Sequence, residues 1–227
     1  MLVVGFDTAT PAVSVAVHDG DRVVAEASAA DGRRHGELLA PMIAKVLAEA
    51  GASRSDLTGV AVGVGPGPYT GLRVGVVTAR VLGAVLGIPV HGVCSLDIIA
   101  AAVTPPAGRE FAVATDARRK EVYWARYAAG GRRLAGPLVG PAAGIPGAAE
   151  LVVAGAGGQL YPEAFGAVIE PAYPDAGTLC GIVAAQLAGP QPPSGPAGVV
   201  PLLAADPLYL RRPDAREPGP PKRVTPS

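Results

Sequence analysis

Three segments of the chain carry residue types that could hold a ligand or take part in catalysis. The first contains Asp7, which ends the apolar run 2–7. Kinases and ATPases that place an aspartate at the end of their first strand follow it with a glycine-rich hairpin, because only glycine lets the backbone approach phosphates closely. Here Thr8-Ala9-Thr10-Pro11 follows, without glycine, and Pro11 has no N–H to donate. Asp7 is therefore either a remnant of a metal-positioning carboxylate or a structural cap of the turn.

The second segment, His35-Gly36-Glu37, places a metal-binding side chain close to an acid. A zinc site on a helix needs two histidines one turn apart and a third ligand. The chain has three histidines, His18, His35 and His91, which lie far apart in sequence. The segment is better explained as the start of a helix, where Glu37 is favoured by the positive end of the helix dipole. We predict no metal site.

The third segment, Gly63-x-Gly65-x-Gly67, has the glycine count of a dinucleotide-binding loop. However, Pro66 and Pro68 occupy positions at which such loops offer N–H groups to phosphate. The spacing elsewhere supports no Ser-His-Asp or Cys-His arrangement. We therefore predict no catalytic residue and no bound cofactor.

The composition limits the class of protein. Of the 227 residues, 49% are hydrophobic and 17% are charged, which allows a sizeable core. The 19 basic and 19 acidic residues cancel. Zero net charge argues against tight binding of RNA or DNA by the chain alone, because phosphate neutralisation supplies most of that affinity. Cys94 and Cys180 are isolated and are expected to be buried, reduced thiols.

The N-terminal residues lack the basic segment of a signal peptide. The longest apolar run, 74–90, is interrupted by Arg80 and Pro89, and is predicted to be too short and too broken for a membrane span. A cytoplasmic location is expected.

The elements that must position these residues follow from hydrophobic periodicity and turn signals. Runs 2–7, 12–18 and 22–29 predict an antiparallel meander with a hairpin turn at Asp19-Gly20-Asp21. A helix over 35–50 ends before Gly51, a strand follows at 59–64, and Thr70 is the expected N-cap of a helix to Leu86. A strand at 89–94 and a helix at 95–103, capped by Ser95, complete the order βββαβαβα. That order is typical of the half-domain of ribonuclease-H-like and actin-like proteins.

The rest of the chain resembles a reduced copy of this half. Residues 104–108 mark a boundary, strands are predicted at 110–115, 121–127 and 151–154, and a helix at 178–188. The predicted organisation is an N-terminal lobe over 1–103, a smaller lobe over 104–211, and a Pro-rich, disordered tail over 212–227. The predicted fold class is α/β, with a mixed sheet flanked by helices in each lobe.

The helix after the third segment carries small residues every four positions, at Gly71, Gly75, Ala79, Gly83 and Gly87. Each interior glycine costs roughly 0.5–1 kcal/mol relative to alanine, so a close approach to another element must offset that cost. The remaining faces of the helix are also apolar. Either burial within this chain or burial against a partner would explain the stripe of small residues.

Taken together, several motifs of the sequence resemble the TsaB family. The motifs that carry the resemblance are Phe6-Asp7-Thr8-Ala9-Thr10, His35-Gly36-Glu37-Leu38-Leu39-x-Pro41-Met42-Ile43, Gly63-x-Gly65-Pro66-Gly67-Pro68-Tyr69-Thr70-Gly71-Leu72-Arg73-Val74-Gly75, Asp116-Ala117-Arg118-x-x-Glu121-Val122-Tyr123 and Tyr209-Leu210-Arg211. They are dense through Val103 and sparser beyond it.

The resemblance implies an actin-like fold and a non-catalytic subunit of the bacterial system that makes threonylcarbamoyladenosine in tRNA. The implied partner is TsaD, the catalytic paralogue that transfers the threonylcarbamoyl group to the adenosine beside the anticodon. TsaE, a small ATPase, joins the complex, and tRNA is met only as part of it. TsaD holds its metal on a His-x-x-x-His pair, where this chain has Ser95 and Ile99. Neither residue can hold a metal alone.

The family's interface lies on the first two helices of the N-terminal lobe, which correspond here to 35–50 and 70–86. The same surface is expected to form a homodimer when the partner is absent. The residues assigned to this interface are His35, Leu38, Leu39, Met42, Ile43, Val46, Leu72, Val74, Gly75, Val77, Thr78, Val81, Leu82 and Val85.

Two other function classes remain as alternatives. An actin-like small-molecule kinase or ATPase would need ATP affinity, which the glycine-free turn after Asp7 disfavours. A metallopeptidase would need a set of metal ligands, and the spacing of the histidines supports none.

Overall fold

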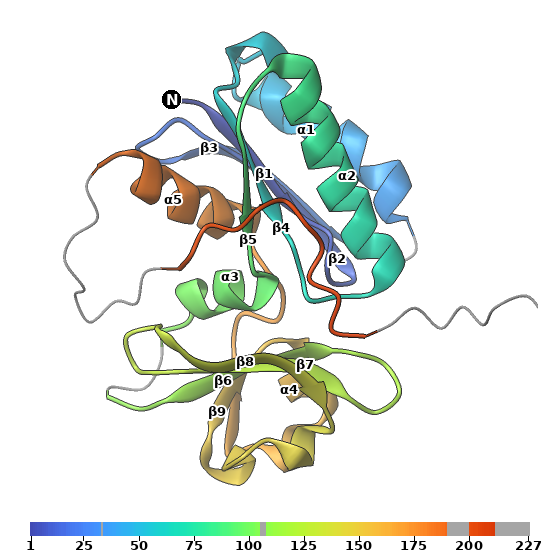
Figure 1. Cartoon of the computed structure of the whole chain (residues 1–227), viewed down its shortest axis with the longest axis vertical. Helices are drawn as coiled ribbons and strands as arrows, with labels where there is room; N and C mark the ends of the chain where they lie inside the picture. Colours follow the sequence, from blue (N-terminus) through green and yellow to red (C-terminus); the bar gives the residue numbers. More distant parts are fainter. Residues whose placement is uncertain (33, 105–107, 190–199, 212–227) are drawn as a thin grey trace, which may run out of the picture.

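A computed structural model describes residues 1–32, 34–104, 108–189 and 200–211. Two five-stranded sheets form two lobes, which are joined through helix α3 and a C-terminal segment that crosses the first sheet's edge (Figure 1). The predicted tail over 212–227 lies outside the described residues. The strands and helices are β1 (Val3–Asp7), β2 (Ala12–His18), β3 (Val23–Ala30), α1 (His35–Glu49), β4 (Gly59–Gly63), α2 (Tyr69–Leu86), β5 (Val90–Val93), α3 (Ser95–Ala102), β6 (Phe111–Asp116), β7 (Val122–Tyr127), β8 (Arg133–Gly140), β9 (Val152–Ala154), α4 (Ala156–Leu160), β10 (Ala167–Ile169) and α5 (Ala176–Leu187).

The two sheets share one topology. The first has the order β3-β2-β1-β4-β5, with β1, β2 and β3 antiparallel and β4 and β5 parallel to β1. The second has the order β10-β9-β6-β7-β8, with antiparallel and parallel pairs in the matching places. The predicted meander, the order βββαβαβα and the reduced second copy are therefore confirmed, and with them the actin-like fold class.

The first sheet is covered on both faces. Helices α1 and α2 pack on one face, where Leu39, Val46 and Leu72 meet Val13 and other strand residues. Helix α5 covers the opposite face (Figure 1). Because both faces are buried, β1, β2 and β4 are buried along their whole length.

The last helix of each lobe in sequence packs on the sheet of the other lobe. Helix α3 follows the first sheet in sequence, but Leu96 and Ile99 pack on the second sheet. Helix α5 follows the second sheet, but Leu179 and Cys180 pack on the first. The division into 1–103 and 104–211 is therefore wrong for α5, which belongs to the core of the N-terminal lobe.

Two predicted helix caps are wrong. Helix α2 begins at Tyr69, with Pro68 in the N-cap position rather than Thr70. Ser95 is the first residue of α3, after Cys94, and its hydroxyl bonds to Asp7 instead of capping the helix. The expected left-handed residue after α1 is confirmed, since Gly51 has φ +66°.

Helix α2 differs from the prediction that the run 74–90 is too short and too broken for a membrane span. Its 18 residues are long and apolar enough to cross a membrane by length and composition, so Arg80 does not interrupt the run as predicted. The helix lies on the first sheet with Leu72, Val76 and Ala79 buried. The core helix of a folded lobe passes the same test.

Candidate partner-binding surface

The predicted interface residues separate into two groups on α1 and α2, which lie side by side on one face of the first sheet (Figure 1). The first group is buried and belongs to the core of the chain itself, and Ile43 in it also forms part of the floor of a surface hollow. They are Leu39, Met42, Ile43, Val46, Leu72 and Gly75.

The second group reaches the surface. Val77, Val81 and Val85 are 53%, 55% and 77% exposed and follow one another every four residues along α2. We call these three residues the valine ridge. Half-buried side chains flank it and complete the outward face of the two helices. They are His35, Leu38, Val74, Thr78 and Leu82.

A hollow lies on each side of α2. The first, of about 560 Å³, lies between α1 and α2 over an apolar floor that includes Ile43, Leu47 and Leu82. The second, of about 570 Å³, lies between α2 and the C-terminal segment, where Pro207 and Tyr209 form the far wall. A ridge between two grooves is the surface that helices present to one another when they pack.

The small residues of α2 face inward rather than toward a partner. A Cβ added at Gly75 would lie 2.5 Å from Thr8 Oγ1, and one added at Gly83 would lie 2.3 Å from Val90 Cγ2. Thr8 Oγ1 donates to the carbonyl of Gly71 at 2.8 Å and accepts from the N–H of Gly75 at 3.0 Å. Burial within the chain therefore explains the small residues inside α2, whereas Gly87 is the exposed, left-handed residue that ends the helix.

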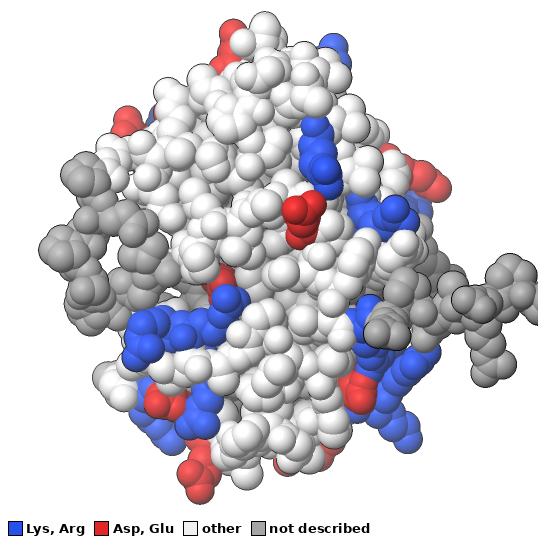
Figure 2. All heavy atoms as spheres, viewed as in Figure 1, with Lys and Arg blue, Asp and Glu red and all other residues white. Residues whose placement is uncertain are grey.

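The outward face of α2 carries little charge. The helix contains Arg73 and Arg80 and has no acidic residue. Arg80 bonds to Asp206 at 3.0 Å, and Arg73 donates to the hydroxyl of Tyr69 at 2.6 Å. In Figure 2 the region around α2 is mostly uncharged, with a few separate basic and acidic side chains. The surface is therefore suited to an apolar contact.

Asp7 lies buried at the base of the first lobe, at the end of β1. Its Oδ1 accepts from the N–H of Ala9 at 2.7 Å, and its Oδ2 accepts from the hydroxyl of Ser95 at 2.5 Å. Burial raises the pKa of Asp7 to about 6, although both hydrogen bonds lower it. A Cβ at Gly63 would lie 1.7 Å from Asp7 Oδ2, which explains the glycine there. Asp7 is thus a structural acceptor that ties β1 to α3.

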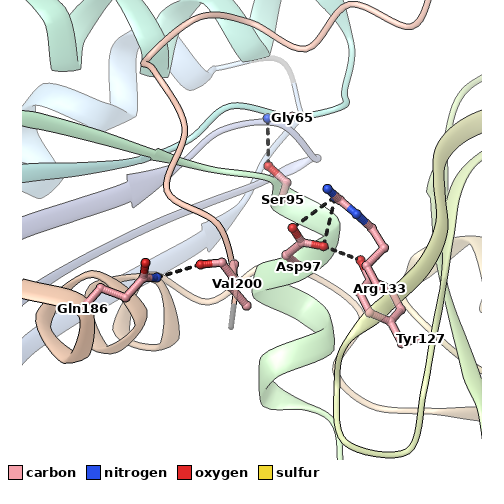
Figure 3. Close-up of polar contacts among 7 residues, drawn as sticks. All are labelled: Gly65, Ser95, Asp97, Tyr127, Arg133, Gln186 and Val200. Atoms are coloured by element: carbon pink, nitrogen blue, oxygen red, sulfur yellow. Dashed lines mark hydrogen bonds and ion pairs between the residues drawn. The ribbon is translucent and has the colours of Figure 1, made fainter. Parts of the chain in front are cut away.

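Ser95 and Ile99 do not form a metal site. The Ser95 hydroxyl also accepts from the N–H of Gly65 at 3.1 Å (Figure 3), and Ile99 is fully buried against the second sheet. His35 Nε2 lies 2.7 Å from the carbonyl oxygen of Thr10, so this ring holds the turn after β1. Across the described part of the chain, no three His, Cys, Asp or Glu side chains come together as metal ligands.

A second buried carboxylate joins the lobes. Asp97 on α3 accepts from the hydroxyl of Tyr127 at 2.8 Å and from Arg133 at 3.1 Å (Figure 3). Burial raises the pKa of Asp97, although Arg133 and Tyr127 lower it. This contact was not predicted from the sequence, although an aspartate within the apolar segment 94–103 is a signal of a buried polar contact.

The C-terminal segment 200–211, which we call the strap, binds both lobes. Leu203 exchanges backbone hydrogen bonds with Gly92 of β5 at 2.8 and 2.9 Å. The ring of Tyr209 stacks on Tyr69 at the start of α2, with a centroid distance of 5.2 Å. Arg211 donates to the carbonyl of Ala117 in the second lobe at 2.8 Å.

The strap brings three of the quoted motifs to one place. Arg211 forms an ion pair with Glu121, beside Ala117 and close to Tyr69. Sequence spacing does not predict that these segments lie together, because they are about fifty or more residues apart in the chain. Together they line a pocket between the lobes.

Comparison with known proteins identifies the family to which the chain is similar. Residues 23–154 match the family model described as TsaD, tRNA N6-adenosine threonylcarbamoyltransferase. The chain is 44% identical to the uncharacterized protein Rv3421c of Mycobacterium tuberculosis over 94% of this chain and 93% of that one. It is also 44% identical to ML0378 of Mycobacterium leprae, of which it spans 56%.

Two further relatives carry more informative names. The tRNA threonylcarbamoyladenosine biosynthesis protein TsaB of Escherichia coli is 36% identical over 56% of this chain and 55% of its own. The solved structure of YeaZ from Pseudomonas aeruginosa is 30% identical, with a TM-score of 0.73 over 92% of this chain and 99% of that chain. Sequence and structure agree along nearly the whole chain, which therefore belongs to the TsaB (YeaZ) family.

Proposed function

We propose that this chain is a non-catalytic subunit that binds and supports a TsaD-like paralogue in the threonylcarbamoylation of the adenosine beside the anticodon in tRNA. Its family relatives are named for the biosynthesis of this nucleoside. The match of residues 23–154 to the TsaD family model also supports a shared fold with the proposed partner. Paralogues with a shared fold can pair through matching helices.

The valine ridge is the observation that carries this proposal. Three large aliphatic side chains stand exposed in a row on α2, between two hollows with apolar floors. An exposed apolar surface of this kind, with a sparsely charged rim, is typical of a protein-binding site. A helix of the partner can place its side chains in the hollows while the valine ridge enters the groove beside that helix.

The ridge alone contributes a moderate part of the binding energy. Full burial of a valine side chain stabilises by roughly 1.5–3 kcal/mol. About half of Val77 and of Val81, and about a quarter of Val85, is already covered. Each valine therefore adds about 1 kcal/mol in a complex, and the three together about 3 kcal/mol. That sum corresponds to a change in Kd of roughly a hundredfold.

The polar groups of the lobe base support a non-catalytic role. Both oxygens of Asp7 are engaged by Ala9 and Ser95, and the side chain is 1% exposed. Ser95 and Ile99 stand where the resemblance places the metal ligands of TsaD. In this proposal the TsaD-like partner catalyses the transfer of the threonylcarbamoyl group, and this chain binds and stabilises that partner.

The other proposed contacts follow from this role. A TsaE-like ATPase and tRNA meet the chain only within the assembly, and a cytoplasmic location follows from the tRNA substrate. A second copy of the chain can cover the valine ridge when the partner is absent, since the same apolar face then remains exposed.

Capture of the cognate TsaD-like protein by the tagged chain tests the proposal. The wild-type chain should retain the partner, and Val81→Glu should lose it while the chain stays folded. Val168→Glu is the matched control, because Val168 is an exposed valine on β10 of the other lobe. Failure of the wild-type chain to capture the partner, or equal capture by Val81→Glu, would sink the proposal.

A further inference from the structure

The first sheet ends in an edge strand, β3, that the proposed partner contact does not use. β3 lies at the end of the sheet opposite β5, whereas α2 packs over β4 and β5. The backbone of β3 hydrogen-bonds to β2 along one side, and the described backbone outside β2 makes no hydrogen bond with it. Alternate N–H and C=O groups along the other side of β3 are therefore available to another strand.

The other three sheet edges are protected against pairing with another chain. The strap covers β5, where Leu203 exchanges two backbone hydrogen bonds with Gly92. Strand β8 contains Pro137 and pairs with β7 in an irregular register, and β10 is only three residues long. Proteins use such features to prevent edge strands from associating. β3 has eight residues, contains no proline, lysine or arginine, and is regular from Ala25 to Ala30.

The regular part of β3 carries small side chains and one charge. Glu26 and Ser28 are exposed and share the face that α5 covers, because the β2 residues opposite them lie beneath that helix. Ala25, Ala27 and Ala29 lie on the other face, which α1 covers. A further strand at the usual spacing of about 4.8 Å would therefore meet no bulky side chain on β3.

The sequence of β3 is complementary to itself in one antiparallel register. A two-fold axis perpendicular to the sheet keeps every side chain on its own face, so the axis must pass through a residue. With the axis at Ala27, Glu26 of each copy lies opposite Ser28 of the other, and a hydroxyl can donate to each carboxylate. An axis at Glu26 would place two carboxylates opposite each other. An axis at Ser28 would place Ala30 opposite Glu26 and give the carboxylate no donor.

We propose that two copies of this chain pair through β3, antiparallel about Ala27, and join their first sheets into one continuous sheet. The contact adds about four to six backbone hydrogen bonds and places Ser28 of each copy against Glu26 of the other. The contact is small, so a dissociation constant in the micromolar range is expected. The valine ridge stays free in this dimer, because α2 lies toward the opposite end of the sheet. The inference does not rest on the proposed function.

Sedimentation equilibrium of the full-length chain carrying Val81→Glu tests the proposal. This background removes pairing through the valine ridge, so the association that remains reports on β3. We expect a reversible dimer. Adding Ser28→Glu should raise Kd at least about tenfold, because the two-fold axis creates two pairs of opposed carboxylates. Adding Ser28→Lys instead places a cation opposite each Glu26 and should lower Kd by about threefold or more.

The matched control adds the same negative charge elsewhere. Ala149 is exposed in the second lobe, so Ala149→Glu should leave Kd unchanged. Glu26→Lys/Ser28→Glu exchanges the charges of the proposed pair and should restore the association that Ser28→Glu alone loses. Thermal unfolding of each variant verifies that the chain is folded. If Ser28→Glu does not fold, Ser28→Lys decides the question alone, because weaker association of that variant would contradict the proposed register.

Hydrogen exchange at low and high protein concentration locates the contact. The amides of β3 should exchange more slowly in the dimer, whereas those of β8, the edge strand of the other lobe, should not change. The proposal is overturned if the Val81→Glu chain stays monomeric at millimolar concentration, if a dimer forms without protection of β3, or if Ser28→Glu and Ser28→Lys associate equally. These results do not depend on the capture of TsaD, so failure here is distinguishable from failure of the proposed function.

Discussion

Gly75→Ala should destabilise the chain, although alanine is the better helix former. The substitution gains about 1 kcal/mol of helix propensity. Its Cβ would lie 2.5 Å from Thr8 Oγ1, inside any real contact distance. Thr8 is 1% exposed, and its hydroxyl is held by Gly71 and by Gly75 itself. Rotation of Thr8 loses two hydrogen bonds, at roughly 1 kcal/mol each, and a shift of the helix instead costs about 1–3 kcal/mol. The net loss should be about 1–2 kcal/mol.

Gly181→Ala is the matched control for this prediction. Gly181 lies in the interior of α5, and a Cβ built there meets nothing within 4 Å. This substitution should stabilise the chain by about 0.5–1 kcal/mol. Urea denaturation of both variants measures the difference. If Gly75→Ala is as stable as Gly181→Ala, the small residues of α2 do not pack inside the chain and the explanation of the stripe fails.

Three other predictions follow from buried groups. Burial raises the pKa of Asp7 to about 6, above its ordinary value of 3.8, so the folded state holds the extra proton between these values. Stability should therefore rise as the pH falls from 7 to 4, by at most about 3 kcal/mol, and Asp7→Asn should remove that part of the pH dependence of the unfolding free energy. Arg133→Met leaves buried Asp97 without its cation and should cost about 3 kcal/mol in urea denaturation, part of which Asp97→Asn in the same chain should restore. Leu39→Glu should unfold the chain, because that side chain is 1% exposed, whereas Val81→Glu should change stability by less than about 0.5 kcal/mol as measured by circular dichroism.

The local pattern of the sequence predicts most of the fold. Alternating valines at 13, 15 and 17 and the Asp-Gly turn after them predict the meander, and the structure has it. Periodicity cannot say on which sheet a helix packs. Helix α5 is apolar on most sides, so nothing in its own residues distinguishes the first sheet from the second. Its exchange with α3 is a property of the assembled lobes.

The candidate surface shows the same limit. Val76 and Val77 are neighbours of one residue type, yet the first is 1% exposed and the second 53%. The sequence shows that α2 is apolar on all sides, and therefore does not determine which side faces outward. Only the position of the sheet, fixed by Gly75 against Thr8, decides which valines remain for a partner.

The pocket between the lobes could not be predicted from spacing. Its cations come from a left-handed turn and from the strap, and a turn of three consecutive non-glycine residues at positive φ has no sequence signal of its own. The resemblance to a family marked the same segments as motifs, without saying that they meet. The tertiary contacts of Arg211 with Ala117 and Glu121 bring them together.

Sedimentation velocity of the purified chain mixed with its TsaD-like paralogue tests the central claim most directly. We expect the wild-type mixture to sediment as a one-to-one complex, and the Val81→Glu mixture to sediment as two separate proteins of which this chain is folded. Separate species in the wild-type mixture, or an undiminished complex with Val81→Glu, would contradict the assignment of the valine ridge as the partner-binding surface.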